Sequence, residues 1–116
     1  MDTLTSTSVT STSTDTFGRT LNTARHNHFV IDSPHEPAEA LSTGESFLAG
    51  ISACGVTLVQ GAARDEEITV DRLSVEITSY RSEAEPADFH HIDVELTYAG
   101  PSLEQAETLT EIWKSR

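Results

Sequence analysis

Cys54 is the only cysteine of the chain and the residue with the most distinctive chemistry. It lies within residues 44–60, GESFLAGISACGVTLVQ, a run rich in apolar, glycine and alanine residues. A thiolate is a strong nucleophile, and a cation beside it favours the charged form. Free cysteine is also one of the residue types that protein cores bury most often. The residue types alone leave both a reactive and a structural thiol open.

Histidines are the second group with ligand chemistry: His26, His28, His35, His90 and His91. Successive residues of a strand point to opposite faces, so His90 and His91 are not expected to bind one ion together. Neither a His-Glu-x-x-His pattern nor a zinc-type Cys/His spacing is present, and no glycine-rich phosphate loop occurs. The sequence therefore predicts no metal site and no cofactor.

The segment around Cys54 is predicted to be a long helix from about Thr43 to Arg64. Ser42 and Glu45 have the Ser-x-x-Glu spacing of a capping box, which satisfies free amides of the first turn. Apolar residues recur behind it at helical spacing, namely Phe47, Leu48, Ile51, Leu58, Val59 and Ala62. Cys54 lies in line with Phe47, Ile51 and Leu58, at the margin of this stripe. We therefore expect the thiol to face an apolar interface, with another backbone or a small ligand close to the small residues around it.

Glu45 is a second candidate for chemistry, but helix geometry separates it from the thiol. Nine residues of α-helix turn through about 180° and rise about 13 Å, so Glu45 and Cys54 cannot share a site within one straight helix. We expect Glu45 to act as the capping carboxylate. A functional role for it would require contact across an interface between two chains.

The remaining elements are predicted from shorter patterns. Residues 2–16 are dominated by Ser and Thr and are either a flexible tail or an edge strand. Residues 17–32 form a predicted hairpin with a polar turn at 24–27, and residues 33–40, with two prolines, a loop. Alternation over 73–77 and 92–98 predicts an antiparallel strand pair. Ser102 and Gln105 then cap a second helix that carries Leu103, Ala106, Leu109, Ile112 and Trp113. This order predicts an α+β fold with helices on one face of an antiparallel sheet.

Composition narrows the class of protein. A chain of 116 residues with a formal net charge of −12 is the size of one domain and would be repelled by nucleic acids and anionic membranes. It has no run of 18 apolar residues, so we expect no bilayer span, and its first residues do not resemble a secretory signal. One cysteine cannot form an intramolecular disulfide, which favours a reducing cytoplasm. The acidic balance would also suit a high-salt cytoplasm.

Together these stretches resemble the OsmC/Ohr family of thiol-dependent hydroperoxide reductases. The resemblance runs from about Phe17 to the end of the chain and is carried by HFVIDSP, ALSTGESFLAGISACG and GPSLEQAETL; it is closest to the OsmC-like branch. It implies a single domain over residues 17–116, in which a curved antiparallel sheet packs on long central helices within an intertwined homodimer. It also implies that Cys54 is the peroxidatic thiol at the dimer interface. Arg19 would hold the thiolate, with Arg25 as the alternative.

The sequence departs from the family in one respect, since the second, resolving cysteine is missing. The resemblance therefore implies reduction of organic hydroperoxides with an external thiol as reductant. Phe47, Ile51, Leu58 and Trp113 would line the pocket for the organic part of the substrate. The alternative is a non-catalytic cytoplasmic homodimer that binds a small apolar ligand or senses oxidation through Cys54.

Overall fold

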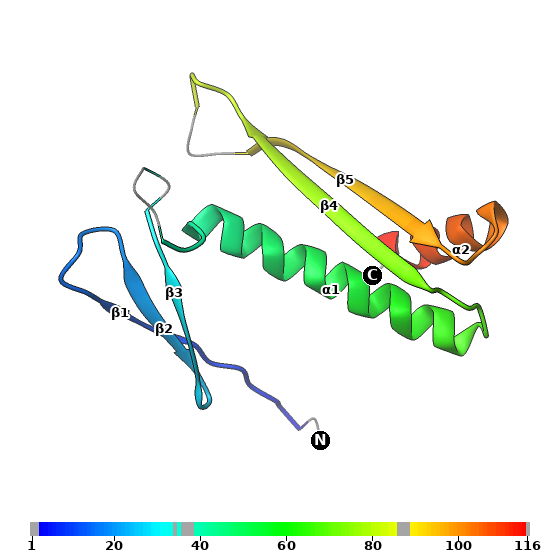
Figure 1. Cartoon of the computed structure of the whole chain (residues 1–116), viewed down its shortest axis with the longest axis horizontal. Helices are drawn as coiled ribbons and strands as arrows, with labels where there is room; N and C mark the ends of the chain where they lie inside the picture. Colours follow the sequence, from blue (N-terminus) through cyan, green and yellow to red (C-terminus); the bar gives the residue numbers. More distant parts are fainter. Residues whose placement is uncertain (1–2, 34, 36–38, 86–88, 116) are drawn as a thin grey trace. The chain divides into compact units, whose positions relative to one another are not determined.

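The protein is described from a computed structural model that covers residues 3–33, 35, 39–85 and 89–115. Its elements follow the order β1, β2, β3, α1, β4, β5, α2 (Figure 1). The chain divides into two compact units, Met1–Phe47 and Leu48–Arg116, and α1 begins in the first and continues through the second. The mixed α+β class predicted from the sequence is confirmed, with the antiparallel strands in two separate sheets.

The first unit contains a three-stranded antiparallel sheet in the order β1-β2-β3, with β1 at Thr10–Ser13, β2 at Thr20–Ala24 and β3 at Asn27–Ile31. The predicted hairpin is confirmed, because Ala24 pairs with Asn27 across a two-residue turn. Arg25 in that turn has a positive φ of 56°. The Ser/Thr-rich segment contributes β1, whose Ser11 donates a 2.6 Å hydrogen bond to the Oδ1 atom of buried Asn22. Four positions of the predicted 33–40 loop, residues 34 and 36–38, lie outside the described residues.

Helix α1 runs from Thr43 to Asp65 and matches the predicted helix within one residue. Its start has the predicted capping box: the Ser42 amide donates to Glu45 Oε1 at 2.8 Å, and the Glu45 amide donates to Ser42 Oγ at 3.2 Å. Both hydrogen bonds satisfy groups that the first helical turn leaves unpaired. Hydrogen bonding to the Ser42 amide, and then to the Ser42 side chain, holds the pKa of the Glu45 carboxyl below its usual value.

The second unit contains the rest of α1, the long hairpin of β4 (Arg72–Arg81) and β5 (Phe89–Ala99), and α2 (Leu103–Lys114). The hairpin is antiparallel, as predicted, and its register pairs Leu73 with Tyr98. Gly100, with a φ of 113°, ends β5 in a conformation that favours glycine. Ser102 and Gln105 then form the second predicted capping box at the start of α2.

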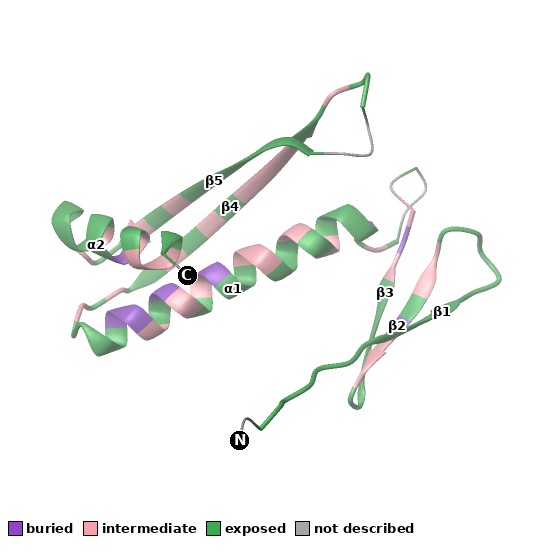
Figure 2. Ribbon diagram, turned by 180° about the vertical axis from the view of Figure 1, so that it is seen from behind, coloured by how far each residue is buried: buried purple, intermediate pink, exposed green. Residues whose placement is uncertain are grey.

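A small core holds the second unit together. Its fully buried apolar residues are Val59, Ala62, Ala63 and Leu109, and partly buried side chains from β4, β5 and α2 pack around them. The buried positions lie on the C-terminal half of α1 and on α2, whereas the hairpin and the first turns of α1 are more exposed (Figure 2). On β5, Ile92 and Val94 remain 38% and 36% exposed. An apolar row on the hairpin is therefore only partly covered by the described part of the chain.

Helix α1 has the length and apolar character that a membrane span could also have. It has 23 residues, and an 18-residue window within it has a mean hydropathy of 1.4, with 22% of the window buried. Core helices of soluble proteins meet the same criterion, so this property alone assigns no membrane. The sequence predicted no membrane span, because it has no run of 18 apolar residues. Helix α1 still meets the averaged criterion, because its isolated Ser, Thr and Gly residues lower the mean hydropathy only slightly. What it establishes is that much of the apolar surface of α1 is open.

Among the glycines of α1, Gly55 lies nearest to a side chain of α2. A Cβ atom at Gly55 would lie 3.2 Å from Nε1 of Trp113, whereas Gly44, Gly50 and Gly61 have nothing within 4 Å of that position among the described residues. We predict that Gly55→Leu lowers the free energy of unfolding by about 1–3 kcal/mol, because the larger side chain must displace the indole. Chemical denaturation followed by circular dichroism measures this change.

Gly61→Ala is the matched control for that substitution. It lies on the same helix in open space, so the better helix propensity of alanine should raise the free energy of unfolding by about 0.5–1 kcal/mol. Equal effects of Gly55→Leu and Gly61→Ala would contradict the assigned contact with Trp113.

Candidate functional site

Cys54 lies on α1 within the second unit and is exposed. Its backbone carbonyl accepts a 3.1 Å hydrogen bond from the Thr57 hydroxyl, a contact within the helix. The aligned apolar residues differ in exposure: Phe47 is 55% exposed, while Ile51 and Leu58 are partly buried. The next residue, Gly55, is buried against Trp113. The thiol is therefore open to solvent on a helix whose neighbouring turn is packed.

Arg19 belongs to the first unit and makes its ion pairs there. Its Nε atom donates to Asp32 Oδ2 at 3.2 Å, and its Nη2 atom lies 3.0 Å from the same oxygen. Its Nη1 atom lies 3.7 Å from Glu39 Oε2. The hydrogen bond with Asp32 raises the pKa of Arg19, so the guanidinium stays charged. Asp32 Oδ2 thus contacts two nitrogens of Arg19 and fixes the orientation of the planar guanidinium.

Asp32 is the functional candidate that sequence reasoning missed. It is 3% exposed, and besides Arg19 it accepts hydrogen bonds from the backbone amides of Glu39 at 2.9 Å and Ser33 at 2.8 Å. These bonds lower the pKa of Asp32 to about 2, with the Glu39 amide as the largest cause, then Arg19 and the Ser33 amide. The available signal was the polar Asp-x-Pro that follows the apolar strand residues, where side-chain turns are common. The buried Asp32 carboxylate accepts hydrogen bonds from three partners and holds the Arg19 side chain in place.

Asp32 makes the stability of the protein sensitive to acid. Its pKa is lower in the folded chain than the ordinary value of 3.8, so its stabilising contribution is complete above that value and is lost as the pH falls towards about 2. We predict that Asp32→Asn lowers the urea midpoint at pH 7, and that the difference from the wild type shrinks between pH 5 and about 2.

The control for this prediction is Asp15→Asn, which changes an exposed carboxylate near the same sheet. Its urea midpoints should follow those of the wild type at every pH. A constant difference between Asp32→Asn and the wild type from pH 7 to pH 2.5 would contradict the assigned role of Asp32.

The other predicted residues have local surroundings of their own. Arg25 is exposed in the β2–β3 turn. Glu45 is engaged in the cap of α1, which confirms the structural role expected for it. Trp113 is partly buried and packs with the core of the second unit. The role of these residues beside Cys54 stays a prediction.

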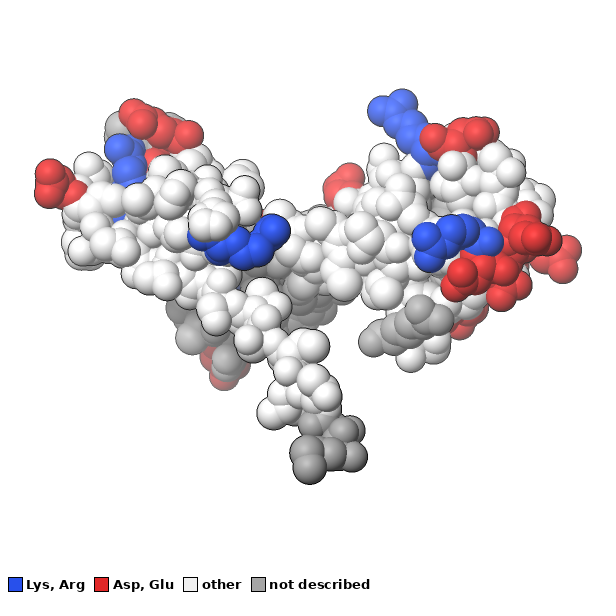
Figure 3. Space-filling model, turned by 90° about the horizontal axis from the view of Figure 1, so that it is seen from below, with Lys and Arg blue, Asp and Glu red and all other residues white. Residues whose placement is uncertain are grey.

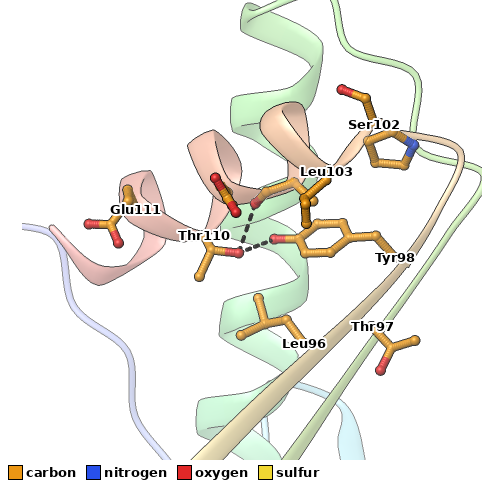
Figure 4. A pocket seen from close by; sticks show the side chains of 10 residues that line it. Leu96, Thr97, Tyr98, Ser102, Leu103, Thr110 and Glu111 are labelled. Atoms are coloured by element: carbon orange, nitrogen blue, oxygen red, sulfur yellow. Dashed lines mark hydrogen bonds between the residues drawn. The ribbon is translucent and has the colours of Figure 1, made fainter.

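An open groove lies between β5 and α2 in the second unit (Figure 4). Its volume is about 490 Å³. The hydroxyl groups of Tyr98 and Thr110 meet at 2.9 Å across it, and Leu103 at its edge is 77% exposed. The rest of the lining combines apolar and acidic side chains: Leu96, Thr97, Pro101, Ser102, Ala106, Glu107 and Glu111. The groove offers a partly apolar surface with carboxylates beside it.

The histidines near the start of β5 correct one piece of sequence reasoning. His90 and His91 were expected to point to opposite faces, yet their Nδ1 atoms lie 2.6 Å apart. A register shift in the β4–β5 ladder explains the difference, because Tyr80 pairs with His91 but Arg81 pairs with Phe89. No group of three or more His, Cys, Asp or Glu side chains suited to a metal ion occurs in the described part of the chain.

The charge of the surface agrees with the acidic composition. In the view of Figure 3, acidic side chains outnumber basic ones, and several of the basic groups lie beside acidic ones. The exposed ion pairs of the second unit include Arg64 with Asp65 at 3.9 Å and Lys114 with Glu111 at 3.2 Å. Exposed pairs of this kind contribute little to stability. The surface therefore stays strongly anionic.

Comparison of the sequence with known proteins finds no match to a protein-family model and none to a curated protein. Comparison of the structure does find matches. An OsmC-like protein from Mycoplasma pneumoniae superimposes with a TM-score of 0.86 at 17% identity, covering 97% of this chain and 82% of that one.

Two further solved structures give the same result. An OsmC-like protein of unknown function from Vibrio cholerae has a TM-score of 0.74 at 13% identity, covering 97% of this chain and 89% of that one. An organic hydroperoxide resistance protein from Elizabethkingia anophelis, with thiocyanate bound, has a TM-score of 0.68 at 17% identity, covering 99% and 85%. At these identities the likeness establishes a shared fold over nearly the whole chain.

Proposed function

We propose that this chain, which has the OsmC/Ohr fold, reduces organic hydroperoxides through Cys54 with an external thiol as reductant. The main support is the position of an exposed, unpaired thiol on the long helix of a fold that an organic hydroperoxide resistance protein also has. The thiol is the only one in this sequence, so the proposed cycle uses no resolving cysteine of the same chain.

The proposed chemistry balances with one hydroperoxide and two external thiols. The Cys54 thiolate attacks the outer oxygen of the hydroperoxide, the O–O bond breaks, and the alkoxide leaves and takes up a proton as the alcohol. Cys54 is then a sulfenic acid. A first external thiol condenses with it to a mixed disulfide and water, and a second releases the Cys54 thiol and the external disulfide.

Arg19 is the cation that we propose for stabilising the thiolate and orienting the peroxide. The support is that Asp32 fixes its Nε and Nη2 atoms while further N–H donors remain on the guanidinium. Arg25, exposed in its turn, is the alternative. The arginine acts on the Cys54 of its own chain or of a second copy. Glu45 would take part only across such an interface.

We further propose that the chain works as a soluble cytoplasmic homodimer. The support is the apolar surface that the single chain leaves open, which includes much of α1 and the 36–38% exposed Ile92 and Val94 of β5. A second copy would cover this surface, and Phe47, Ile51, Leu58 and Trp113 would then line an apolar pocket near the thiol. Light scattering should give twice the chain mass of 12.6 kDa. A monomer at micromolar concentration would contradict the dimer.

The test of the enzyme is consumption of an alkyl hydroperoxide by the wild-type chain, with a monothiol and a dithiol compared as reductants. We expect turnover with an external thiol, and faster turnover with an alkyl hydroperoxide than with hydrogen peroxide, because an apolar pocket favours the organic part. Consumption of one equivalent without turnover under both reductants would contradict the proposed cycle.

The second candidate function is binding without catalysis, and the groove between β5 and α2 favours it. Its volume of about 490 Å³ and its apolar side chains fit a small apolar ligand, independently of Cys54. The pH profile of Cys54 alkylation separates the two functions. A midpoint well below the value of about 8.5 for free cysteine supports the enzyme, and a midpoint at or above it supports the binding protein.

A further inference from the structure

His90 and His91 bring two ring nitrogens together on the surface of the β4–β5 hairpin. Their Nδ1 atoms are 2.6 Å apart, although successive residues of a regular strand point to opposite faces. The ladder pairs Tyr80 with His91 and Arg81 with Phe89, so His90 is an extra residue on β5. Such a bulge re-aims the side chains at its position. The contact between the two imidazoles therefore follows from the backbone.

A cation can take the place of the proton that these two nitrogens share. At a typical metal–nitrogen distance of about 2.0–2.1 Å, two imidazoles at right angles around an ion have nitrogens about 2.9 Å apart. A tetrahedral arrangement needs about 3.3–3.4 Å between them. The observed 2.6 Å is closer to the right-angled arrangement, which Cu(II) and Ni(II) prefer and Zn(II) does not.

The surroundings hold this pair and attract a cation. The ring of His91 stacks on Tyr80 with centroids 4.4 Å apart and an interplanar angle of 20°. A shallow depression beside Tyr80, with a volume of about 410 Å³, is lined by the carboxylates Glu76, Asp93 and Glu95. Three carboxylates on one face raise the local concentration of divalent cations.

We propose that His90 and His91 form a bidentate surface site for a divalent cation with tetragonal coordination, Cu(II) in preference to Ni(II) and Zn(II). Water completes the coordination, since the described residues hold no group of three suitable ligands. The site stands apart from the peroxidase proposal, because it uses neither Cys54 nor Arg19.

The test uses the full-length chain with Cys54→Ser, which removes the thiol as a competing ligand and as a reductant of Cu(II). Cu(II) is titrated at pH 7.5 by calorimetry against a weak chelator, and electron paramagnetic resonance counts the bound imidazole nitrogens. We expect one tetragonal site with two imidazole nitrogens. His90→Gln and His91→Gln should each weaken Cu(II) binding at least about tenfold, with circular dichroism unchanged.

His28→Gln is the matched control, because His28 is an exposed histidine on β3 whose Nδ1 atom lies 2.9 Å from the Thr23 hydroxyl. It should leave Cu(II) binding unchanged. Binding that survives both His90→Gln and His91→Gln, a spectrum with a single imidazole nitrogen, or tighter binding of Zn(II) than of Cu(II) would each overturn the proposal.

Discussion

Replacing Cys54 by serine is expected to abolish hydroperoxide turnover, with a loss of at least about a thousandfold. A serine hydroxyl has nearly the same size, but it is almost never ionised near neutral pH and does not form a sulfenic acid. Cys54 is exposed on α1, so the substitution should leave the fold intact. Hydroperoxide consumption is measured under the same excess of thiol for both proteins, with circular dichroism to compare their folding.

Gln60→Ala serves as the control for Cys54→Ser, since it removes an exposed polar side chain from the same helix. Its turnover should equal that of the wild type. The decisive contrary result is Cys54→Ser protein that consumes hydroperoxide at the wild-type rate. In that case the thiol is not the reacting group, whatever the alkylation profile shows.

The largest expected effect on stability comes from Leu109→Ala. Leu109 is 0% exposed and lies in a core that has only four fully buried apolar residues among those described. Removing most of its side chain loses apolar burial and leaves a cavity, so we expect the free energy of unfolding to fall by about 3–5 kcal/mol. That is a large share of the 5–15 kcal/mol typical of a folded domain. Urea unfolding at a fixed chain concentration measures it.

Leu103→Ala is the matched control on the same helix. Leu103 is 77% exposed at the first turn of α2, so truncation should change the free energy of unfolding by no more than about 0.5 kcal/mol. Similar effects of the two substitutions would show that the core is not centred on Leu109. The groove beside Leu103 can be probed with the same variant, because its stability stays close to that of the wild type.

Local features were the most predictable part of this fold. Both capping boxes, at Ser42 with Glu45 and at Ser102 with Gln105, follow from residues three positions apart, and both form. The strand pair and the two-residue hairpin turn follow from alternation and turn chemistry in the same way. The OsmC/Ohr fold predicted from the resemblance is confirmed by the structural comparison.

Features that depend on distant residues were less predictable. The register of the β2–β3 hairpin, continued one position beyond Thr20 and Ile31, places Arg19 opposite Asp32, so the predicted hairpin already indicates this pair. The bond from the Glu39 amide to Asp32 crosses a loop, and no spacing rule indicates it. The bulge at His90 depends on the register of β4 against β5, which alternation alone does not determine. For Cys54 the sequence gives the helix and its apolar stripe. Its actual exposure depends on how α2 and the hairpin cover α1, a result of packing.

The contact between Trp113 and Gly55 has an optical consequence. Trp113 is the only tryptophan of the chain, and its indole lies against the residue that follows Cys54. Indole emission responds to nearby polarity and to quenching groups. Trp113 emission therefore reports how α2 packs on α1 beside Gly55, the residue that follows Cys54, without a dye or an engineered label.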